Sequence, residues 1–209
     1  MSTATHTEQY NFGGRLIQLV VPDYALLQQN YLQQQLPAAP FWAKLWPSSL
    51  ALCHYLEQHP FLIRNKTIME IGAGLGLPSL LAAYYAAKVI CTDNEPEAVR
   101  TVQQSVLLNG LQNIECREFD WRYAGSLEAS DVILLSDINY NPSDFPLVMS
   151  LLKAMLAKQV EIILSTPQRL MAKPFIEQLL PFCVEKTTIP VKTATETAEI
   201  FIMRLQKQG

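Results

Sequence analysis

The sequence predicts an α/β fold in which a largely parallel sheet is covered by helices on both faces. From residue 67 onward, short apolar runs alternate with amphipathic segments, the pattern of repeated strand–helix units. Three glycines spaced two apart, Gly72, Gly74 and Gly76, directly follow the first apolar run. Residues 182–205 differ, because they predict two strands with no helix between them and therefore an antiparallel hairpin.

Length and composition are those of one globular domain. The chain has 209 residues, of which 49% are hydrophobic and 17% are charged, so it is long enough for a sizeable core. We therefore expect a single domain over residues 1–209, with an N-terminal hairpin and helix extension over 1–36 and a core over 37–209. Lys and Arg number 16 against 19 Asp and Glu, a net charge of −3, which does not favour a nucleic-acid partner.

The cysteines and the chain start bear on the cellular compartment. Cys53, Cys91, Cys116 and Cys183 are far apart, without the paired spacing of a disulfide framework or a metal site, so we expect free thiols and no metal. The first residues show no basic segment followed by an apolar one, and no apolar run reaches the length of a membrane helix. These features predict a cytoplasmic protein that does not bind membranes. They leave the oligomeric state open.

The N-terminal extension reads as a hairpin followed by a helix. Residues 1–10 are polar and we expect them to be loose. Residues 10–21 predict two short strands around a Gly-Gly turn at 13–14. Asp23 follows them and can cap a helix that runs to about residue 35.

A proline- and tryptophan-rich segment over residues 37–47 joins the extension to the core. Its three prolines predict an extended, helix-free chain. Pro47 suits the first turn of a helix running to about residue 58. Exposed tryptophans are unfavourable unless they cover something, so Trp46 could close over a cofactor and Trp42 could border a substrate channel, although simple core packing is an equal alternative.

The core is predicted from its apolar periodicity. Strands are expected over residues 68–71, 88–92, 113–119, 131–135 and 160–164, helices over 77–84, 95–109, 143–156 and 168–181, and the terminal hairpin over 182–189 and 197–205. In such a sheet, ligands bind beyond the carboxyl ends of the parallel strands. Four consecutive strands end at or beside a carboxylate, which predicts the functional site there.

Spacing in the glycine loop indicates the kind of cofactor. A dinucleotide fingerprint places its third glycine where this chain has Leu77, and the third glycine comes one residue early, at Gly76. A NAD-binding protein is therefore disfavoured. Glu70 precedes the first glycine, where its carboxylate would face a cationic group rather than a pyrophosphate.

The loop Glu70-Ile-Gly-Ala-Gly-Leu-Gly76 resembles motif I of S-adenosylmethionine (SAM) methyltransferases. Asp137-Ile-Asn-Tyr140 resembles the Asp-x-x-Tyr motif that follows the fourth strand of the seven-strand protein lysine methyltransferases of family 16. The resemblance runs from about residue 10 to the C-terminus. It implies a Rossmann-like seven-strand sheet, SAM as the cofactor, and methyl transfer to a lysine side-chain nitrogen of a protein substrate.

The resemblance also implies roles for individual residues. SAM would be surrounded by Trp46, Gly72, Ala73, Gly74, Asp93, Trp121 and Ser136, with Glu70, Gly76 and Asp120 completing the cofactor site. Asp93 would accept the ribose hydroxyls, and Asp120 would accept a hydrogen bond from the adenine amino group beside Trp121. Asp137 and Tyr140 would border the acceptor nitrogen.

Three alternatives stay open. The chain could be a SAM-binding assembly factor without turnover, or it could methylate a small molecule or RNA. The Asn-Pro-Pro-Tyr signature of amino-group nucleic-acid methyltransferases is absent, and residues 137–142 match it only partly. The third is the NAD-binding protein already disfavoured by Leu77. Neither the target protein nor the number of methyl groups added can be read from the sequence.

Overall fold

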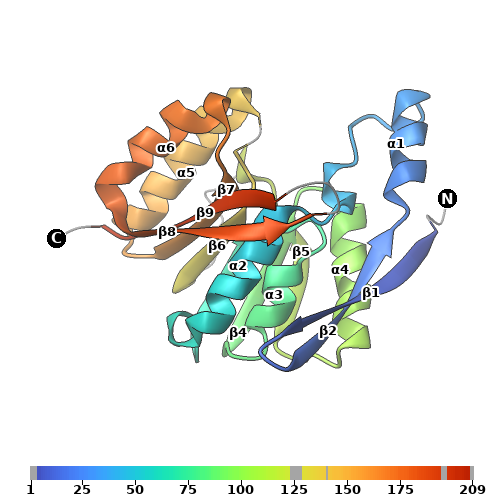
Figure 1. Ribbon diagram of the computed structural model, residues 1–209, viewed down its shortest axis with the longest axis horizontal. Helices are drawn as coiled ribbons and strands as arrows, with labels where there is room; N and C mark the ends of the chain where they lie inside the picture. Colours follow the sequence, from blue (N-terminus) through green and yellow to red (C-terminus); the bar gives the residue numbers. More distant parts are fainter. Residues whose placement is uncertain (1–3, 123–128, 140, 194–196, 208–209) are drawn as a thin grey trace.

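A computed structural model of the chain describes residues 4–122, 129–139, 141–193 and 197–207. Its centre is a seven-stranded sheet in the order β5-β4-β3-β6-β7-β9-β8 (Figure 1). The strands of this sheet are β3 (Thr67–Ile71), β4 (Lys88–Asp93), β5 (Ile114–Glu118), β6 (Val132–Ser136), β7 (Glu161–Pro167), β8 (Cys183–Lys192) and β9 (Thr197–Leu205). Strands β3 to β7 run parallel, whereas β9 is antiparallel to both β7 and β8. This arrangement confirms the predicted fold class.

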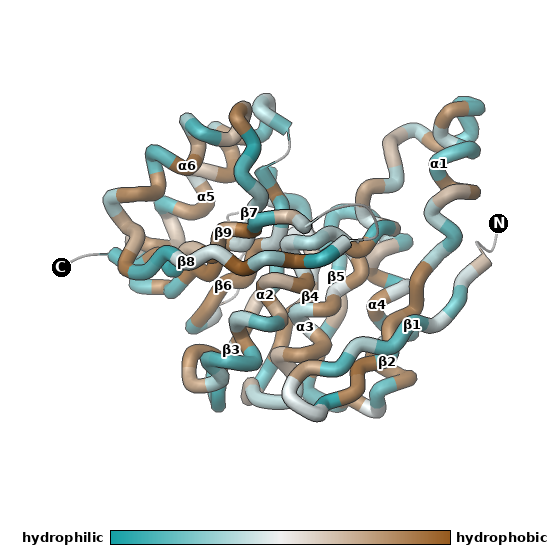
Figure 2. Tube along the Cα trace, viewed as in Figure 1, coloured by the Kyte–Doolittle hydropathy of each residue, from teal (hydrophilic) through white to brown (hydrophobic). Residues whose placement is uncertain are grey.

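Helices cover both faces of the sheet. The α-helices of the described residues are α1 (Tyr24–Leu32), which belongs to the N-terminal extension and stands apart from the sheet, and α2 (Pro47–Gln58), α3 (Leu77–Ala82), α4 (Pro96–Leu108), α5 (Phe145–Ala157) and α6 (Lys173–Leu179). Helices α2 and α3 pack on one face, and α5 and α6 pack on the other (Figure 1). Figure 2 shows hydrophobic and hydrophilic residues interspersed along α5 and α6, as expected for helices with one face on the sheet and the other in water.

Successive residues of the central strands serve opposite faces. In β6, Val132 and Leu134 belong to the core beneath α2 and α3, whereas Ile133 and Leu135 belong to the core beneath α5 and α6. Because side chains alternate along a strand, a strand buried on both faces must be apolar throughout. This explains why β6 reads as a continuous apolar run.

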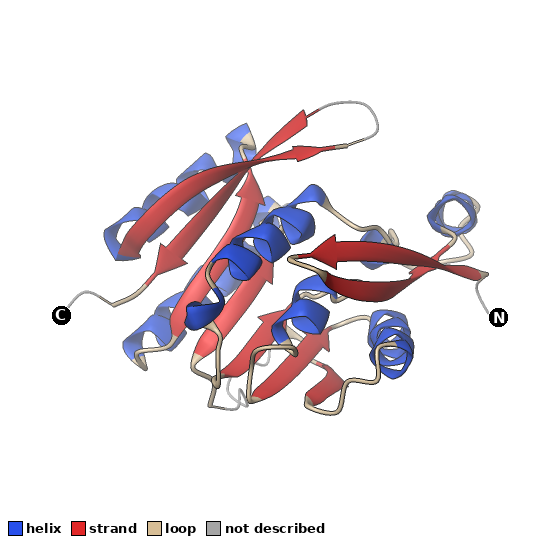
Figure 3. Cartoon of the chain, turned by 60° about the horizontal axis from the view of Figure 1, so that its bottom comes forward, coloured by secondary structure: helices blue, strands red, loops and turns tan. Residues whose placement is uncertain are grey.

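The N-terminal hairpin forms a separate two-stranded sheet of β1 (Thr5–Phe12) and β2 (Arg15–Pro22) (Figure 3). The edge of the hairpin formed by β2 is hydrogen-bonded to polar side chains of α4 and of Asn109, which follows α4. The Ser105 hydroxyl accepts from the Val20 amide at 3.0 Å, and the Asn109 side chain accepts from the Gln18 amide at 2.9 Å. These bonds satisfy backbone groups that a free edge strand would leave unpaired.

Some boundaries differ from those predicted. Residues 5–9 are not loose, because they pair with β2 in register from Thr5 opposite Pro22. Helix α1 begins after Asp23, whose side chain caps it as predicted, but ends at Leu32. Residues 168–181 are not one helix, because two short 3₁₀ turns flank α6, whose first turn contains Pro174. The first difference has a tertiary cause, because the pairing of residues 5–9 with β2 is not a property of the local sequence.

None of the helices within the described ranges combines the length and the hydrophobicity needed to cross a bilayer. The four cysteines are free thiols, with Cys53 and Cys91 buried and Cys116 and Cys183 partly buried.

Candidate active site

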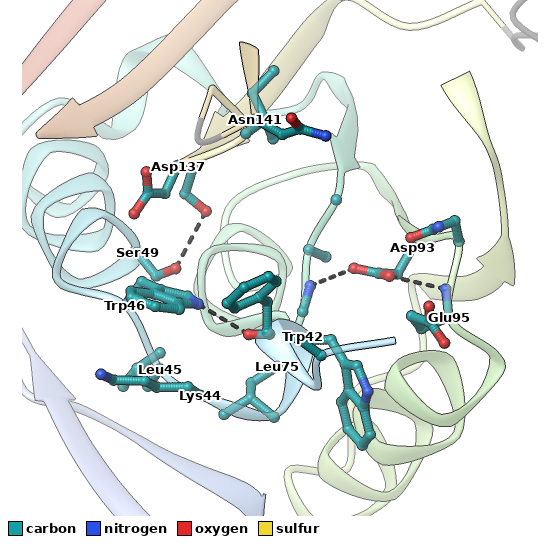
Figure 4. A pocket seen from close by; sticks show the side chains of 18 of the residues that line it. Trp42, Lys44, Leu45, Trp46, Ser49, Leu75, Asp93, Glu95, Asp137 and Asn141 are labelled. Carbon is teal, nitrogen blue, oxygen red and sulfur yellow. Dashed lines mark hydrogen bonds between the residues drawn. The ribbon is translucent and has the colours of Figure 1, made fainter. Parts of the chain in front are cut away.

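A pocket of about 620 Å³ opens at the carboxyl ends of the central strands (Figure 4). Its walls come from parts of residues 38–49, 72–75, 93–95, 136–138 and 169–171, together with Trp121 and Asn141. The volume is that of an ordinary small-molecule site. Segments distant in sequence therefore meet where a doubly wound sheet binds its ligands.

The glycine loop between β3 and α3 forms one wall. Gly74 has φ +56°, and a Cβ on it would lie 3.1 Å from the carbonyl oxygen of Trp42. A side chain at this position would be strained and would strike the crossing segment, so the loop offers bare backbone to the pocket. Gly76 differs, because it does not line the pocket and a Cβ there would lie 2.9 Å from both γ carbons of Val102 on α4.

Asp93 at the tip of β4 is tied to this loop by backbone hydrogen bonds (Figure 4). Its carboxylate accepts from the Gly74 amide at 2.8 Å and from the Glu95 amide at 3.0 Å. Burial raises the pKa of Asp93, and the two amide hydrogen bonds oppose that rise. Each carboxylate oxygen retains a second lone pair, so Asp93 can still accept from a ligand.

Glu95 is a pocket residue that the sequence motifs did not single out. It lies two residues beyond Asp93 and precedes α4, but its side chain makes no capping hydrogen bond with the described residues. Burial, and then the charge of Asp93, raises the pKa of Glu95. The sequence carries one signal for Glu95, a second carboxylate just past a strand end, but the same residue also fits the start of the predicted helix 95–109.

Two predicted cofactor residues, Glu70 and Asp120, are not among the lining residues. Glu70 is fully buried and accepts from the Ser79 amide at 2.9 Å and the Ser79 hydroxyl at 2.6 Å. Burial raises the pKa of Glu70 to about 7. Asp120 instead accepts from Arg122 Nε at 2.8 and 3.0 Å, and this pairing lowers its pKa. In the structure both carboxylates therefore hydrogen-bond to protein groups, Glu70 to Ser79 and Asp120 to Arg122.

The segment containing Trp42 and Trp46 forms another wall of the pocket. It contains a single 3₁₀ turn, Phe41–Ala43, where the sequence predicted an extended chain. Trp46 Nε1 donates to the Phe41 carbonyl at 3.0 Å, and Lys44 Nζ lies 4.6 Å from the centre of the Trp46 ring. Both tryptophans line the pocket. The segment is therefore held in shape by its own side chains.

The opposite wall is the end of β6. The hydroxyls of Ser136 and Ser49 are 3.2 Å apart, which links this strand to the first turn of α2. Asp137 has φ +59°, and its amide donates to the Ser165 carbonyl at 2.9 Å. Tyr140, the second residue predicted at the acceptor nitrogen, lies outside the described residues.

Asp137 is paired with Arg169, a residue that was not predicted to belong to the site. Arg169 Nη2 donates to Asp137 Oδ2 at 2.9 Å, and Nη1 donates to Oδ1. Burial raises the pKa of Asp137, and Arg169 lowers it. The two residues are 32 positions apart, so no local pattern signals the pairing.

The pocket and its motifs match those of a known protein family. A family model described as "Lysine methyltransferase" matches residues 29–181. The chain belongs to this family. This match confirms the family predicted from the motifs that contain Gly72 and Asp137.

Curated relatives include enzymes named for two acceptor residues. The human protein named histone-arginine methyltransferase METTL23 is 32% identical over 143 residues, which cover 65% of this chain and 75% of that protein. The Xenopus tropicalis protein N-lysine methyltransferase METTL21A is 30% identical over 131 residues, covering 61% of each. The alignment with mouse METTL23 spans only about half of that relative, 49%.

Solved structures agree with the fold. One is the 16S rRNA N2 G1207 methyltransferase RsmC of T. thermophilus, in complex with AdoMet and guanosine. It superposes over 100% of this chain and 52% of that chain with a TM-score of 0.68 and 18% identity. At this identity the likeness establishes the methyltransferase fold alone.

Proposed function

We propose that this chain is a SAM-dependent N-methyltransferase that transfers methyl groups to a lysine side-chain nitrogen of a protein substrate. One observation carries the proposal: a single pocket joins the glycine loop on one side to Asp137 on the other. A cofactor lying along the loop and an acceptor side chain reaching Asp137 would share this space. Membership of the lysine methyltransferase family supports this interpretation.

The residues around the loop fit SAM. Trp46, Gly72, Ala73, Gly74, Asp93, Trp121 and Ser136 all line the pocket and would hold it. Glu95 adds a second carboxylate for the ribose hydroxyls beside Asp93. Trp121 lies against the loop, with a ring carbon 3.5 Å from where a Cβ on Gly72 would be, and would cover the adenine.

Three other predicted residues, Glu70, Gly76 and Asp120, do not line the pocket and would support the residues that do. Glu70 anchors the first turn of α3 through Ser79, and Gly76 lets that helix approach α4. Asp120 and Arg122 would fix the chain beside Trp121. We therefore propose supporting roles for these three residues in place of direct ligand contacts.

When bound, SAM supplies a methyl group on a sulfonium centre that a neutral amine can attack. A lysine ammonium has no lone pair, and releasing its proton to water at neutral pH costs about 4–5 kcal/mol for an ordinary pKa. Asp137 would orient the ammonium, with Tyr140 proposed beside the nitrogen. The largely apolar mouth formed by Phe41, Trp42 and Met171 would favour the neutral amine by desolvation. The chain's main contribution is then to position the two reactants.

The remaining assignments are proposals of the same kind. A protein substrate agrees with the names of the curated relatives, and the net charge of −3 argues against nucleic acid. A cytoplasmic location is supported by the four free thiols, because reduced cysteines are typical of that compartment. We also propose that residues 1–209 act as one domain, with residues 1–36 as its extension.

An arginine acceptor is a second candidate, favoured by one specific observation. In the structure the Asp137 carboxylate already accepts two hydrogen bonds from a guanidinium, that of Arg169. Relatives from four vertebrates carry the name histone-arginine methyltransferase. We therefore propose that Asp137 would accept the planar guanidinium of a substrate arginine as well as an ammonium.

The test begins with calorimetry, in which SAM should bind and NAD should not. Tritiated SAM and the purified chain are then added to a lysate of cells lacking the protein, and the proteins are resolved by gel fluorography. A labelled protein band that is lost with Asp137→Asn supports the proposal. Acid hydrolysis of the band and amino-acid analysis separates methyl-lysine from methyl-arginine.

The other outcomes identify the alternatives. Label confined to RNA or small molecules would replace the protein substrate. SAM binding without label in any fraction would favour an assembly factor. NAD binding without SAM binding would overturn the proposed function altogether.

A further inference from the structure

The backbone of Asp137 is fixed by a hydrogen bond to β7, and its carboxylate is bound by the side chain of Arg169. The amide hydrogen bond to Ser165 continues the β6–β7 ladder, and the Asp137 side chain is 6% exposed. Arg169 covers both carboxylate oxygens with two guanidinium nitrogens. Such a two-point pair is the strongest geometry available to a carboxylate and a cationic side chain.

Arg169 comes from a segment with little apolar anchoring. The next two residues, Leu170 and Met171, are 91% and 53% exposed, and only Ala172 returns to the core. The Arg169 side chain itself is 29% exposed, compared with 6% for Asp137. Segments with few buried apolar contacts open at low cost. The guanidinium can therefore leave Asp137 without disturbing the sheet.

A cationic substrate side chain would need the same two oxygens. Two cations within about 4 Å of each other in a partly buried site repel strongly. The other charged lining residues are Lys44, which lies over the Trp46 ring, and Asp93 and Glu95, which lie on the side of the glycine loop, where Asp93 accepts from the Gly74 amide. A substrate cation and Arg169 therefore compete for Asp137.

Resting on the proposed function, we propose that Arg169 is a specificity-determining residue that occupies the acceptor subsite with its own guanidinium. A substrate side chain enters only by displacing this group from Asp137. The apparent affinity for a cation is then reduced by the fraction of time for which the subsite is open. A subsite open for about 1–10% of the time would lower that affinity roughly 10- to 100-fold.

The test measures binding of a lysine side-chain mimic rather than turnover. The full chain is saturated with S-adenosylhomocysteine and titrated with n-butylammonium chloride, and binding is followed by two-dimensional NMR. We expect Arg169→Gln to bind the probe at least tenfold more tightly than the unmodified chain. The double variant with Asp137→Asn should lose this gain. Arg100→Gln, which removes an equal charge from an exposed pair with Glu97 on α4, is the matched control and should bind as the unmodified chain does.

Equal binding by Arg169→Gln and the unmodified chain would overturn the inference, as would a gain that survives Asp137→Asn or appears in Arg100→Gln. Should Arg169→Gln not fold, as judged by circular dichroism, Arg169→Lys serves instead because it keeps the charge without the two-point geometry. A gain of threefold or more then supports competition, and no gain contradicts it. Failure of S-adenosylhomocysteine to bind at the first step would contradict the proposed function and not the role of Arg169.

Discussion

The two ends of the pocket hold their carboxylates in different ways. Asp93, on the side of the glycine loop, accepts hydrogen bonds from the backbone amides of Gly74 and Glu95. Asp137, across the pocket, accepts hydrogen bonds from the side chain of Arg169. Both carboxyl groups are largely buried, and burial raises the pKa of each, so the difference lies in the donor and not in the depth.

We call the glycine loop together with Asp93 the fixed half of the site, and Asp137 together with Arg169 the exchangeable half. A backbone amide cannot leave its partner unless the loop itself unfolds, whereas a side chain can rotate away. The loop is also closely packed, with Gly76 against Val102, while Leu170 next to Arg169 projects into solvent. A cofactor shared by a whole family suits the fixed half, and acceptors that differ between relatives suit the exchangeable half.

The packing difference predicts the largest effect on stability. Gly76→Ala should lower the free energy of unfolding by about 3 kcal/mol, because it combines a positive φ with a Cβ 2.9 Å from two carbons of Val102. Leu170→Ala, in the exchangeable half, should change it by less than about 0.5 kcal/mol, because the side chain is 91% exposed. Urea denaturation followed by circular dichroism measures both.

Gly110→Ala is the matched control for Gly76→Ala. Gly110 has φ +63°, but a Cβ added there would have nothing within 4 Å, so only the backbone strain of about 1–2 kcal/mol should appear. If Gly76→Ala were no more costly than Gly110→Ala, the loop would not be closely packed and the comparison would fail.

The fixed half should also carry a pH dependence. Glu70 has its pKa raised by burial from 4.5 to about 7. Between these values the folded chain keeps a proton that the unfolded chain has lost, so stability falls as the pH rises through this window. Glu70→Gln should remove roughly 2 kcal/mol of the stability difference between pH 5 and pH 8. Urea titrations at the two pH values measure this, and an unchanged difference would show that Glu70 is not held in its neutral form.

Binding of the cofactor should distinguish the two carboxylates. Asp93→Asn should weaken SAM binding at least tenfold, about 1.4 kcal/mol, because a ribose acceptor and the anchor of the Gly74 amide are both altered. Asp137→Asn should leave SAM affinity within about threefold, since its carboxylate belongs to the acceptor end. Calorimetry on both variants is the measurement. Equal losses in the two variants would remove the distinction between the halves.

A small effect is also expected at Asp120. Asp120→Asn should change SAM affinity by less than about threefold, because Asp120 does not line the pocket and pairs with Arg122. The same calorimetric titration measures it. A loss of tenfold or more would restore the direct adenine contact that the sequence predicted and would extend the fixed half beyond the glycine loop.

Local patterns were sufficient where a residue's role depends on its neighbours in sequence. The helix predicted to start at Pro47 and end near residue 58 is α2, Pro47–Gln58, because proline at the first turn and the apolar spacing are local properties. Four predicted cofactor residues line the pocket: Trp46, Gly72, Asp93 and Ser136. They could be predicted because ligands of such a sheet bind at the carboxyl ends of its strands, which can be located from the sequence. Residues 168–181 were harder, since Pro174 permits either one helix or several short turns.

By itself the sequence determined the α/β class, the strand ends that meet at the pocket, and the family, because periodicity and motif spacing are written along the chain. Only the tertiary structure decided which partner each carboxylate has. Glu70 binds Ser79, Asp93 binds Gly74, and Asp137 binds Arg169. The physical reason is clearest for the pair of Asp137 and Arg169, which are 32 positions apart. Their hydrogen bond depends on how β6 and β7 align, and the residues around Arg169 do not specify that alignment.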